Sequence, residues 1–217
     1  MVAVIDATKV GLKWLLVVRD PHAKENVYAR FLYSESTSDY QAARLELEQC
    51  GFTFSAIVSD GRFIAVPWLF KGIPLQMCHY HQIQIIIKYL TRNPKLEAGI
   101  ELLELVRTLP HTDAASFTDA FNLWCRTWET FLKEKTHDEE TGRWHWTHKR
   151  VRQARDSVNA HLPFLFTYEK YPELNIPNTS NSLDGSFKKA KIALAVHSGL
   201  SPVRQQKLVM TLLFPPD

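Results

Sequence analysis

Residues 1–20 read MVAVIDATKVGLKWLLVVRD, and two apolar runs within this stretch decide the fold class. Val2, Val4 and Ile5 lead into Asp6. The second run, 14–18, is continuously apolar and rich in β-branched residues, and Arg19, Asp20 and Pro21 end it. Uninterrupted apolar runs of this length are typical of strands that are buried on both faces. We therefore expect a sheet that is covered on both sides.

The rest of the chain supplies further strands and then mostly helices. We predict strands at 27–33, 54–58 and 75–78, with a helix between the first two that begins near Thr37 and ends at Gly51. Apolar residues then recur at helical spacing, at 82–90 and through most of 95–135. Ser180 to Ser182 offer caps for a helix that runs to about 198, and Pro202 starts a last helix. The pattern predicts an α/β fold.

Composition excludes some classes of protein. The 217 residues are 45% hydrophobic, so the chain can build a core and is not a disordered tail. No run approaches the roughly 18 apolar residues of a membrane helix. Three cysteines in a domain of this size favour free thiols in a reducing compartment. We expect a cytoplasmic protein that is neither secreted nor inserted in a membrane.

The net charge of +3 conceals an asymmetric distribution. Residues 95–140 are acidic, whereas 143–155 (RWHWTHKRVRQAR) carry bases and no acid. In this basic stretch aromatic rings can stack on an unpaired base while arginines follow the phosphates. The alternative is that the tryptophans complete a core. The candidate DNA-binding residues of this stretch are Arg143, Trp144, Trp146, Lys149, Arg150, Arg152 and Arg155.

Three aspartates stand at the ends of predicted elements. Asp6 lies in or after the first strand, Asp60 follows the strand at 54–58 beside Gly61, and Asp184 lies in the first turn of the later helix. Each alone is best read as a turn former or a helix-dipole partner. Together, carboxylates from two strands and a helix are what two divalent cations need, because Mg²⁺ prefers oxygen ligands.

At these residues the sequence resembles a family. The order VIDATKV, VSDGR, PLQMCHYHQ, a helical stretch and NTSNSLDGSFKKAK before HSGLS is similar to the catalytic domain of DDE/D transposases of the insertion-sequence and Mutator-like type. The resemblance implies a ribonuclease H-like mixed sheet flanked by helices, with an all-helical insertion between the second and third acids. The implied domains are 1–83, 84–176 and 177–217, with the third acid in the last.

The same resemblance implies a mechanism. Asp6, Asp60 and Asp184 would be the catalytic triad and would hold two Mg²⁺ or Mn²⁺ ions for DNA cleavage and strand transfer. The family usually has Glu at the third position, and the shorter Asp184 requires a helix that sits closer to the sheet. Lysines commonly follow the third acid, so Lys188 and Lys191, at i+4 and i+7 from Asp184, are expected to contact DNA. The alternative for them is a solvated face of ion pairs.

Cys78 and His81 have half the spacing of a zinc site. A structural zinc takes four ligands, and no second pair has the right spacing, so we do not expect zinc. We interpret Cys78 as a buried thiol and place His81 beside the metal ions or the scissile phosphate. Cys78, His81 and Asn181 are the candidate accessory residues of the site.

The expected partners are transposon ends and target DNA, bound by a homodimer or a larger assembly associated with a bacterial nucleoid. Two alternatives stay open: a degenerate or domesticated transposase core that binds DNA or protein without chemistry, and another ribonuclease H-like nuclease. Asp6 stands only five residues after Met1, whereas such transposases ordinarily place end-recognition modules before the first acid. We therefore expect an upstream DNA-binding region to be encoded elsewhere or lost.

Overall fold

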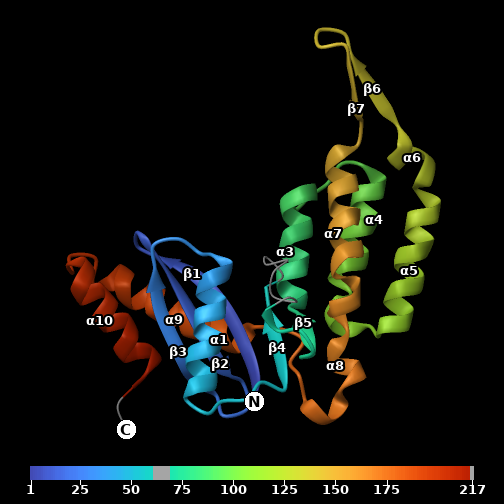
Figure 1. Cartoon of the computed structure of the whole chain (residues 1–217). Coiled ribbons are helices and arrows are strands. Elements are labelled where there is room, and N and C mark those ends of the chain that lie inside the picture. The colour runs from blue at the N-terminus through green and yellow to red at the C-terminus, as the bar shows by residue number, and fades with distance from the viewer. Residues whose placement is uncertain (61–68, 216–217) are drawn as a thin grey trace. The chain divides into compact units, whose positions relative to one another are not determined.

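The computed structural model describes residues 1–60 and 69–215. Contacts divide the chain into two compact units (Figure 1). The first joins Met1–Cys78 to Tyr171–Asp217, and the second is His79–Lys170. The functional division into 1–83, 84–176 and 177–217 stays a prediction, because compactness alone does not show what each part does. Among the described helices, none is long and apolar enough to cross a bilayer.

The first unit is built on one mixed sheet with the strand order β3-β2-β1-β4-β5. Its strands are β1 (Val2–Val10), β2 (Lys13–Asp20), β3 (Glu25–Leu32), β4 (Ala56–Ser59) and β5 (Leu75–Met77). β2 is antiparallel to both β1 and β3, whereas β4 is parallel to β1 and β5 is parallel to β4. Gly11, with φ of +59°, allows the tight turn between β1 and β2.

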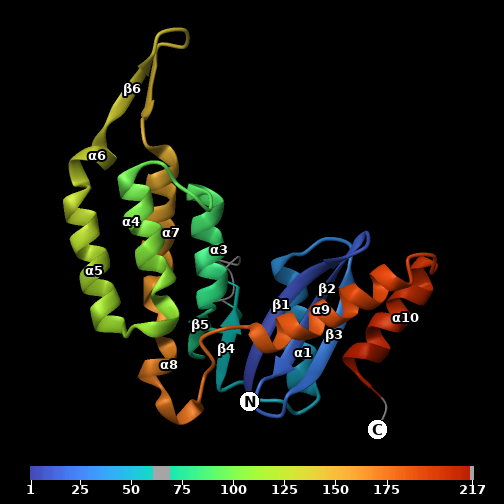
Figure 2. The ribbon, with the colours of Figure 1, turned by 180° about the vertical axis from the view of Figure 1, so that it is seen from behind.

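The sheet is covered on both faces. Ala3, Ile5 and Ala7 of β1 belong to a buried cluster with residues of α1 (Thr37–Gln49). Because side chains alternate along a strand, Val2, Val4 and Asp6 point to the other face. There α9 (Asn181–Val196) packs on β1 through its buried side (Figure 2). The layers and strand order confirm the expected ribonuclease H-like arrangement.

A final helix, α10 (Pro202–Leu213), packs against α9 and β3. Pro202 occupies its first turn, as the sequence predicted. The Asn26 side-chain amide in β3 donates to the carbonyl oxygen of Leu213 at 2.8 Å, which ties the end of α10 to this strand.

The second unit is a helical assembly with an aromatic core. Phe117, Phe121 and Trp124 of α5 are buried within it. Its helices are α3 (His79–Leu90), α4 (Glu97–Arg107), α5 (Ala114–Thr127), α6 (Glu129–Lys133), α7 (Lys149–Leu165) and α8 (Thr167–Lys170). The helix predicted to start at 82 begins three residues earlier, at His79.

The prediction of an all-helical insertion is wrong in one place. β6 (Lys135–Asp138) and β7 (Arg143–Trp146) form an antiparallel hairpin that extends beyond the helices of this unit (Figure 1). Residues 135–147 contain no aliphatic side chain, so they could not complete an apolar helix face. The turn is fixed by the Asp138 carboxylate, which accepts the amides of Glu140 and Thr141, and by Gly142, with φ of +64°.

Candidate metal centre

Asp6 is a buried carboxylate in the middle of β1. It is only 6% exposed, and its Oδ1 accepts the amide of Ala7 at 2.7 Å. The strand continues past it to Val10, so Asp6 lies inside the strand, which is one of the two positions that the sequence allowed. A charge this deep in a strand is costly unless something compensates for it, which makes Asp6 the starting point of the site.

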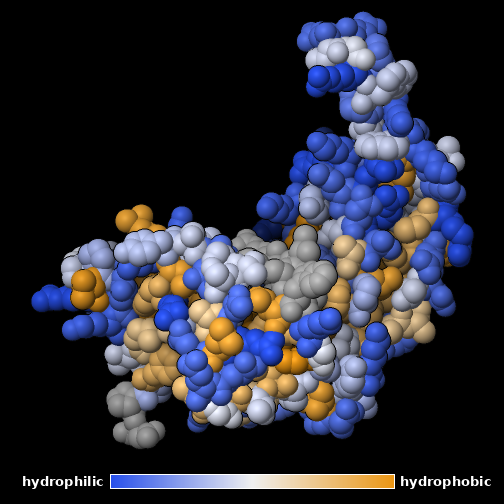
Figure 3. Space-filling model, viewed as in Figure 1, coloured by the Kyte–Doolittle hydropathy of each residue, from blue (hydrophilic) through white to orange (hydrophobic). Residues whose placement is uncertain are grey.

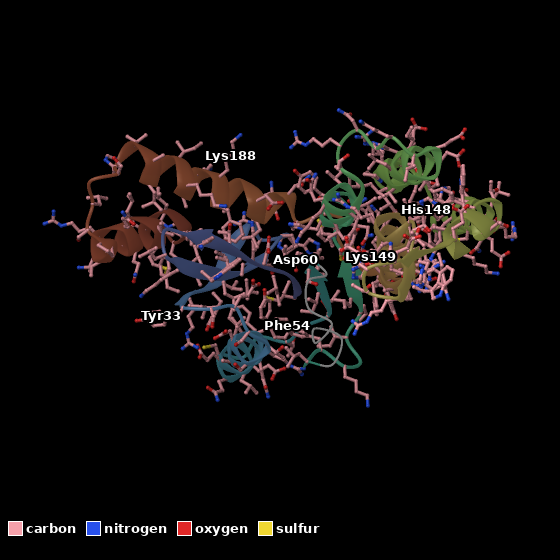
Figure 4. The ribbon with its side chains drawn as sticks, turned by 90° about the horizontal axis from the view of Figure 1, so that it is seen from above. Tyr33, Phe54, Asp60, His148, Lys149 and Lys188 are labelled. Carbon is pink, nitrogen blue, oxygen red and sulfur yellow. The ribbon has the colours of Figure 1, made fainter. Side chains whose placement is uncertain are left out.

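Asp60 follows β4 directly and is 7% exposed. β4 runs parallel to β1 with Ser59 opposite Ile5, so Asp60 falls level with Asp6 on the neighbouring strand. Equivalent positions on adjacent strands point to the same face, and both aspartates therefore belong to the face that α9 covers. Figure 4 labels Asp60 at the end of β4. Gly61, which we expected to turn the chain here, lies outside the described residues.

Asp184 comes from the first turn of α9 and is half-buried. One of its carboxylate oxygens and one of Asp6 lie within 4.8 Å of each other. The residues are 178 positions apart in the sequence, and only the packing of α9 on β1 brings them together. This distance meets the requirement that the shorter Asp side chain imposed, namely a helix close to the sheet.

Ser180 connects Asp184 to Cys78, and sequence reasoning gave it only a capping role. It is fully buried, and its hydroxyl lies 3.3 Å from Oδ2 of Asp184 and 3.4 Å from Sγ of Cys78. Its amide donates to the same sulfur at 3.3 Å. Cys78 is a buried thiol, as predicted, and its amide donates to the carbonyl oxygen of Ser59. Ser180 thus orients the third carboxylate.

Tyr40 is a second residue that the sequence indicated only as part of a helix face. It is 2% exposed, and its hydroxyl donates to Oε1 of Glu35 at 2.6 Å. Burial raises the pKa of Tyr40 far above its ordinary value, and the negative charges of Glu35, Asp60 and Asp6 raise it further. The phenol therefore stays protonated and supplies a hydrogen-bond donor in an acidic neighbourhood.

The donors fit a hard divalent cation. Asp6 and Asp184 offer carboxylate oxygens close enough together to ligate a common ion, and Asp60 lies level with Asp6 on the next strand. The Cys78 thiol already accepts two hydrogen bonds from Ser180, which makes it a poor candidate for a metal ligand. His81 lies in the first turn of α3, in the second unit, and Asn181 is exposed at the start of α9. The accessory roles of both stay predictions.

Lys188 and Lys191, the two candidate DNA-binding lysines of α9, lie in different surroundings. Lys191 reaches the sheet, where its Nζ donates to Oγ1 of Thr8 at 2.6 Å. Thr8 lies two residues beyond Asp6 and so faces the same side of β1. Lys188 is exposed, and its side chain points away from the sheet (Figure 4). Lys191 therefore lies on the same face of the sheet as the aspartates.

The basic stretch spans β7 and the start of α7, and protein groups engage most of its guanidinium groups. Arg150 donates to the carbonyl oxygen of Lys88 at 3.0 Å, and Arg152 to that of Leu132 at 2.5 Å. Arg155 pairs with Asp156 at 2.5 Å. Lys149 and Arg143 are exposed. The stretch is thus less uniformly available to phosphates than its sequence indicated.

Comparison of the sequence with protein-family models gave no match, and comparison with curated proteins gave none either. Among solved structures, the chain is similar to the catalytic core domain of BIV integrase. The two are 16% identical, the alignment covers 79% of this chain and 93% of that one, and the TM-score is 0.26. The assignment to the ribonuclease H-like fold rests on the strand order and pairing of the sheet.

Proposed function

We propose that this chain is the catalytic core of a DDE/D transposase that cleaves DNA and transfers the freed strand with the help of divalent cations. The observation that carries the proposal is the meeting of Asp6 and Asp184 beside Asp60 on one covered face of the sheet. Bringing the buried Asp6 close to Asp184, with the buried Asp60 level with it on the next strand, is unfavourable for a metal-free fold, and divalent cations would remove that penalty. The insertion-sequence or Mutator-like type is the finer part of the proposal, and the order of the sequence motifs supports it.

Asp6, Asp60 and Asp184 would hold two Mg²⁺ or Mn²⁺ ions. When bound there, such a pair would supply activation of an attacking water or 3′-hydroxyl and stabilisation of the leaving oxygen. The chain's own residues prepare the site. Ser180 holds the Asp184 carboxylate in place, the Ala7 amide fixes one oxygen of Asp6, and Lys191 lies on the same face, where it can contact a phosphate.

The partners follow from this chemistry. We propose that DNA ends and target DNA bind beside Asp6, Asp60 and Asp184, and that Lys188 contacts phosphates farther from these aspartates. Residues 143–155 would provide a second DNA surface, chiefly through Arg143, Trp144 and Lys149, which are exposed. Two ends must be processed together, so we propose a homodimer or a larger assembly on DNA, acting at a bacterial nucleoid.

The test combines metal binding with DNA chemistry. Electron paramagnetic resonance would follow Mn²⁺ binding, and nicking of supercoiled plasmid and joining of duplexes with a free 3′-hydroxyl would follow catalysis. We expect Asp6→Asn and Asp60→Asn to lose both properties and the exposed Asp119→Asn to keep both. Nicking that survives the first two substitutions would refute the proposal. A wild-type protein that binds no Mn²⁺ would favour the degenerate core, and nicking without joining would favour another ribonuclease H-like nuclease.

A further inference from the structure

The β6–β7 hairpin presents two different faces. Cross-strand partners share a face, and Trp146 is paired with Lys135 and Trp144 with His137. The opposite face carries Thr136, Asp138, Arg143 and His145. The ribbon therefore has one face with both tryptophans and no carboxylate, which we call the tryptophan face (Lys135, His137, Trp144 and Trp146).

The two indoles of the tryptophan face differ in their contacts and in their exposure to solvent. Cations already lie over the Trp146 ring, with Nζ of Lys135 at 4.7 Å from its centroid and the guanidinium carbon of Arg152 at 3.7 Å. Contacts of this kind fix the ring and use its π surface. Trp144 is 66% exposed, and His137 meets its ring at 5.0 Å with a tilt of 56°. Trp144 is thus the more available of the two.

The surroundings of Trp144 are polar. Residues 135–147 contain no aliphatic side chain, and the hairpin is coloured hydrophilic to neutral in Figure 3. A protein-docking patch would combine exposed aromatic rings with other apolar residues. A largely exposed indole among cations and histidines instead matches the way in which proteins hold an unpaired nucleobase, with a ring for the base and nearby cations for the phosphates.

The hairpin is anchored at its base, which lets it hold a ligand in a defined place. His148 stacks on Phe131 with the ring centroids 3.5 Å apart and pairs with Glu134 at 2.8 Å. The hydroxyls of Thr136 and Thr147 are hydrogen-bonded at 2.8 Å. Beyond Trp144, the turn carries the carboxylates of Asp138, Glu139 and Glu140. Phosphates would be repelled there, so a strand should stop at Trp144 and not cross the tip.

We propose that the tryptophan face binds the end of a single DNA strand, with one unpaired nucleobase stacked on Trp144 and the adjoining phosphate contacted by Lys135. This inference rests on the proposed function only in taking DNA as the ligand. It needs neither the metal ions nor the aspartates.

The experiment measures DNA binding by the whole protein in EDTA, by fluorescence anisotropy. Two labelled duplexes of equal length are compared, one blunt and one with a five-nucleotide 3′ overhang. We expect Trp144→Ala to weaken binding of the overhang duplex roughly tenfold to a hundredfold, as one lost stacking contact does. Trp144→Phe should restore most of the affinity, and Leu123→Ala, which removes an exposed side chain on α5, should change nothing. Binding of the blunt duplex should be unaffected by all three variants.

An unchanged overhang affinity in Trp144→Ala, or an equal loss for both duplexes, would overturn the inference. Binding of a lysine-rich peptide by the wild type in preference to DNA would also overturn the inference. The exposed indole of Trp144 and the carboxylates of the turn could together bind a cation. Circular dichroism checks that each variant is folded. Two results distinguish this inference from the proposed function. The Trp144 effect on overhang binding should persist in an Asp6→Asn background, because it does not depend on the metal site. If that effect is found but the wild-type protein does not nick DNA, only the proposed function is refuted.

Discussion

Replacing Asp6 with asparagine should stabilise the metal-free protein while removing its response to metal. Asp6 is 6% exposed, and one of its oxygens lies within 4.8 Å of an oxygen of Asp184. Two unit charges at that separation repel each other by about 3 kcal/mol at an effective dielectric constant of about 20. Asp184 is half-buried, and solvent screening lowers the expected gain to about 1–2 kcal/mol. For a chain of this size, that gain raises Tm by about 2–8 °C.

Asparagine is suited to this test because it has the size of aspartate and retains an oxygen that can accept the Ala7 amide. Thermal unfolding is followed at pH 8, where ordinary histidines are neutral, first in EDTA and then in excess Mn²⁺. In EDTA the variant should melt above the wild type. In Mn²⁺ the wild type should gain stability through binding to its folded state, and the variant should not.

The control is Asp20→Asn, which changes a carboxylate in an Asx turn where Oδ1 accepts the amides of His22 and Ala23. Its stability should change by no more than about 0.5 kcal/mol, with the wild-type response to Mn²⁺ retained. The reasoning is refuted if Asp6→Asn melts below the wild type in EDTA, because the carboxylate would then be stabilising without metal. It is refuted equally if Mn²⁺ stabilises the variant as much as the wild type.

Two further substitutions probe other contacts. Ser180→Ala should lower the free energy of unfolding in urea by about 1–2 kcal/mol and weaken Mn²⁺ binding, because it removes the hydroxyl bonded to Asp184; unchanged values for both would show that Ser180 does not orient the carboxylate. Burial lowers the pKa of His79, so the unfolded chain takes up this proton at a higher pH than the folded one, and stability should fall as the pH drops below about 6.5. Urea unfolding at pH 7.5 and 5.5 measures how much free energy of unfolding is lost on acidification. The loss should be smaller for His79→Asn than for the wild type or the exposed His111→Asn. An equal loss in all three proteins would show that His79 does not cause the pH dependence.

The sheet could be predicted because continuous apolar runs in the sequence indicate its strands. Leu15 to Val18 are buried whichever face they point to, and no helix pattern competes with such a run. Asp6 was conspicuous for the same reason, as a charge in a strand. That Asp184 joins it was implied by the resemblance to transposases, since no local pattern links residues so far apart.

The missed features depend on contacts that local sequence does not encode. Ser180 lies in the polar run NTSNS, where nothing distinguishes it from its neighbours until α9 docks. Tyr40 has the helical spacing of a core residue, and its hydroxyl contact with Glu35 appears only in three dimensions. The hairpin was missed because helical residues on both sides extended that pattern across it. Lys188 and Lys191 share a helix stripe, yet Lys191 has the partner on the sheet and Lys188 lies in solvent.

The order in which the first unit's pieces are synthesised has a consequence for folding in the cell. Its strands leave the ribosome within the first 78 residues, but α9, which covers the Val2 and Val4 side of the sheet, follows more than a hundred residues later. At about 5–20 residues per second, one apolar side of the nascent sheet stays open for roughly 5–20 seconds. During that time His79–Lys170 can fold from its own local contacts. Until then this side of the sheet exposes apolar surface that can aggregate, and Asp184 can join Asp6 only after the residues of α9 have been synthesised.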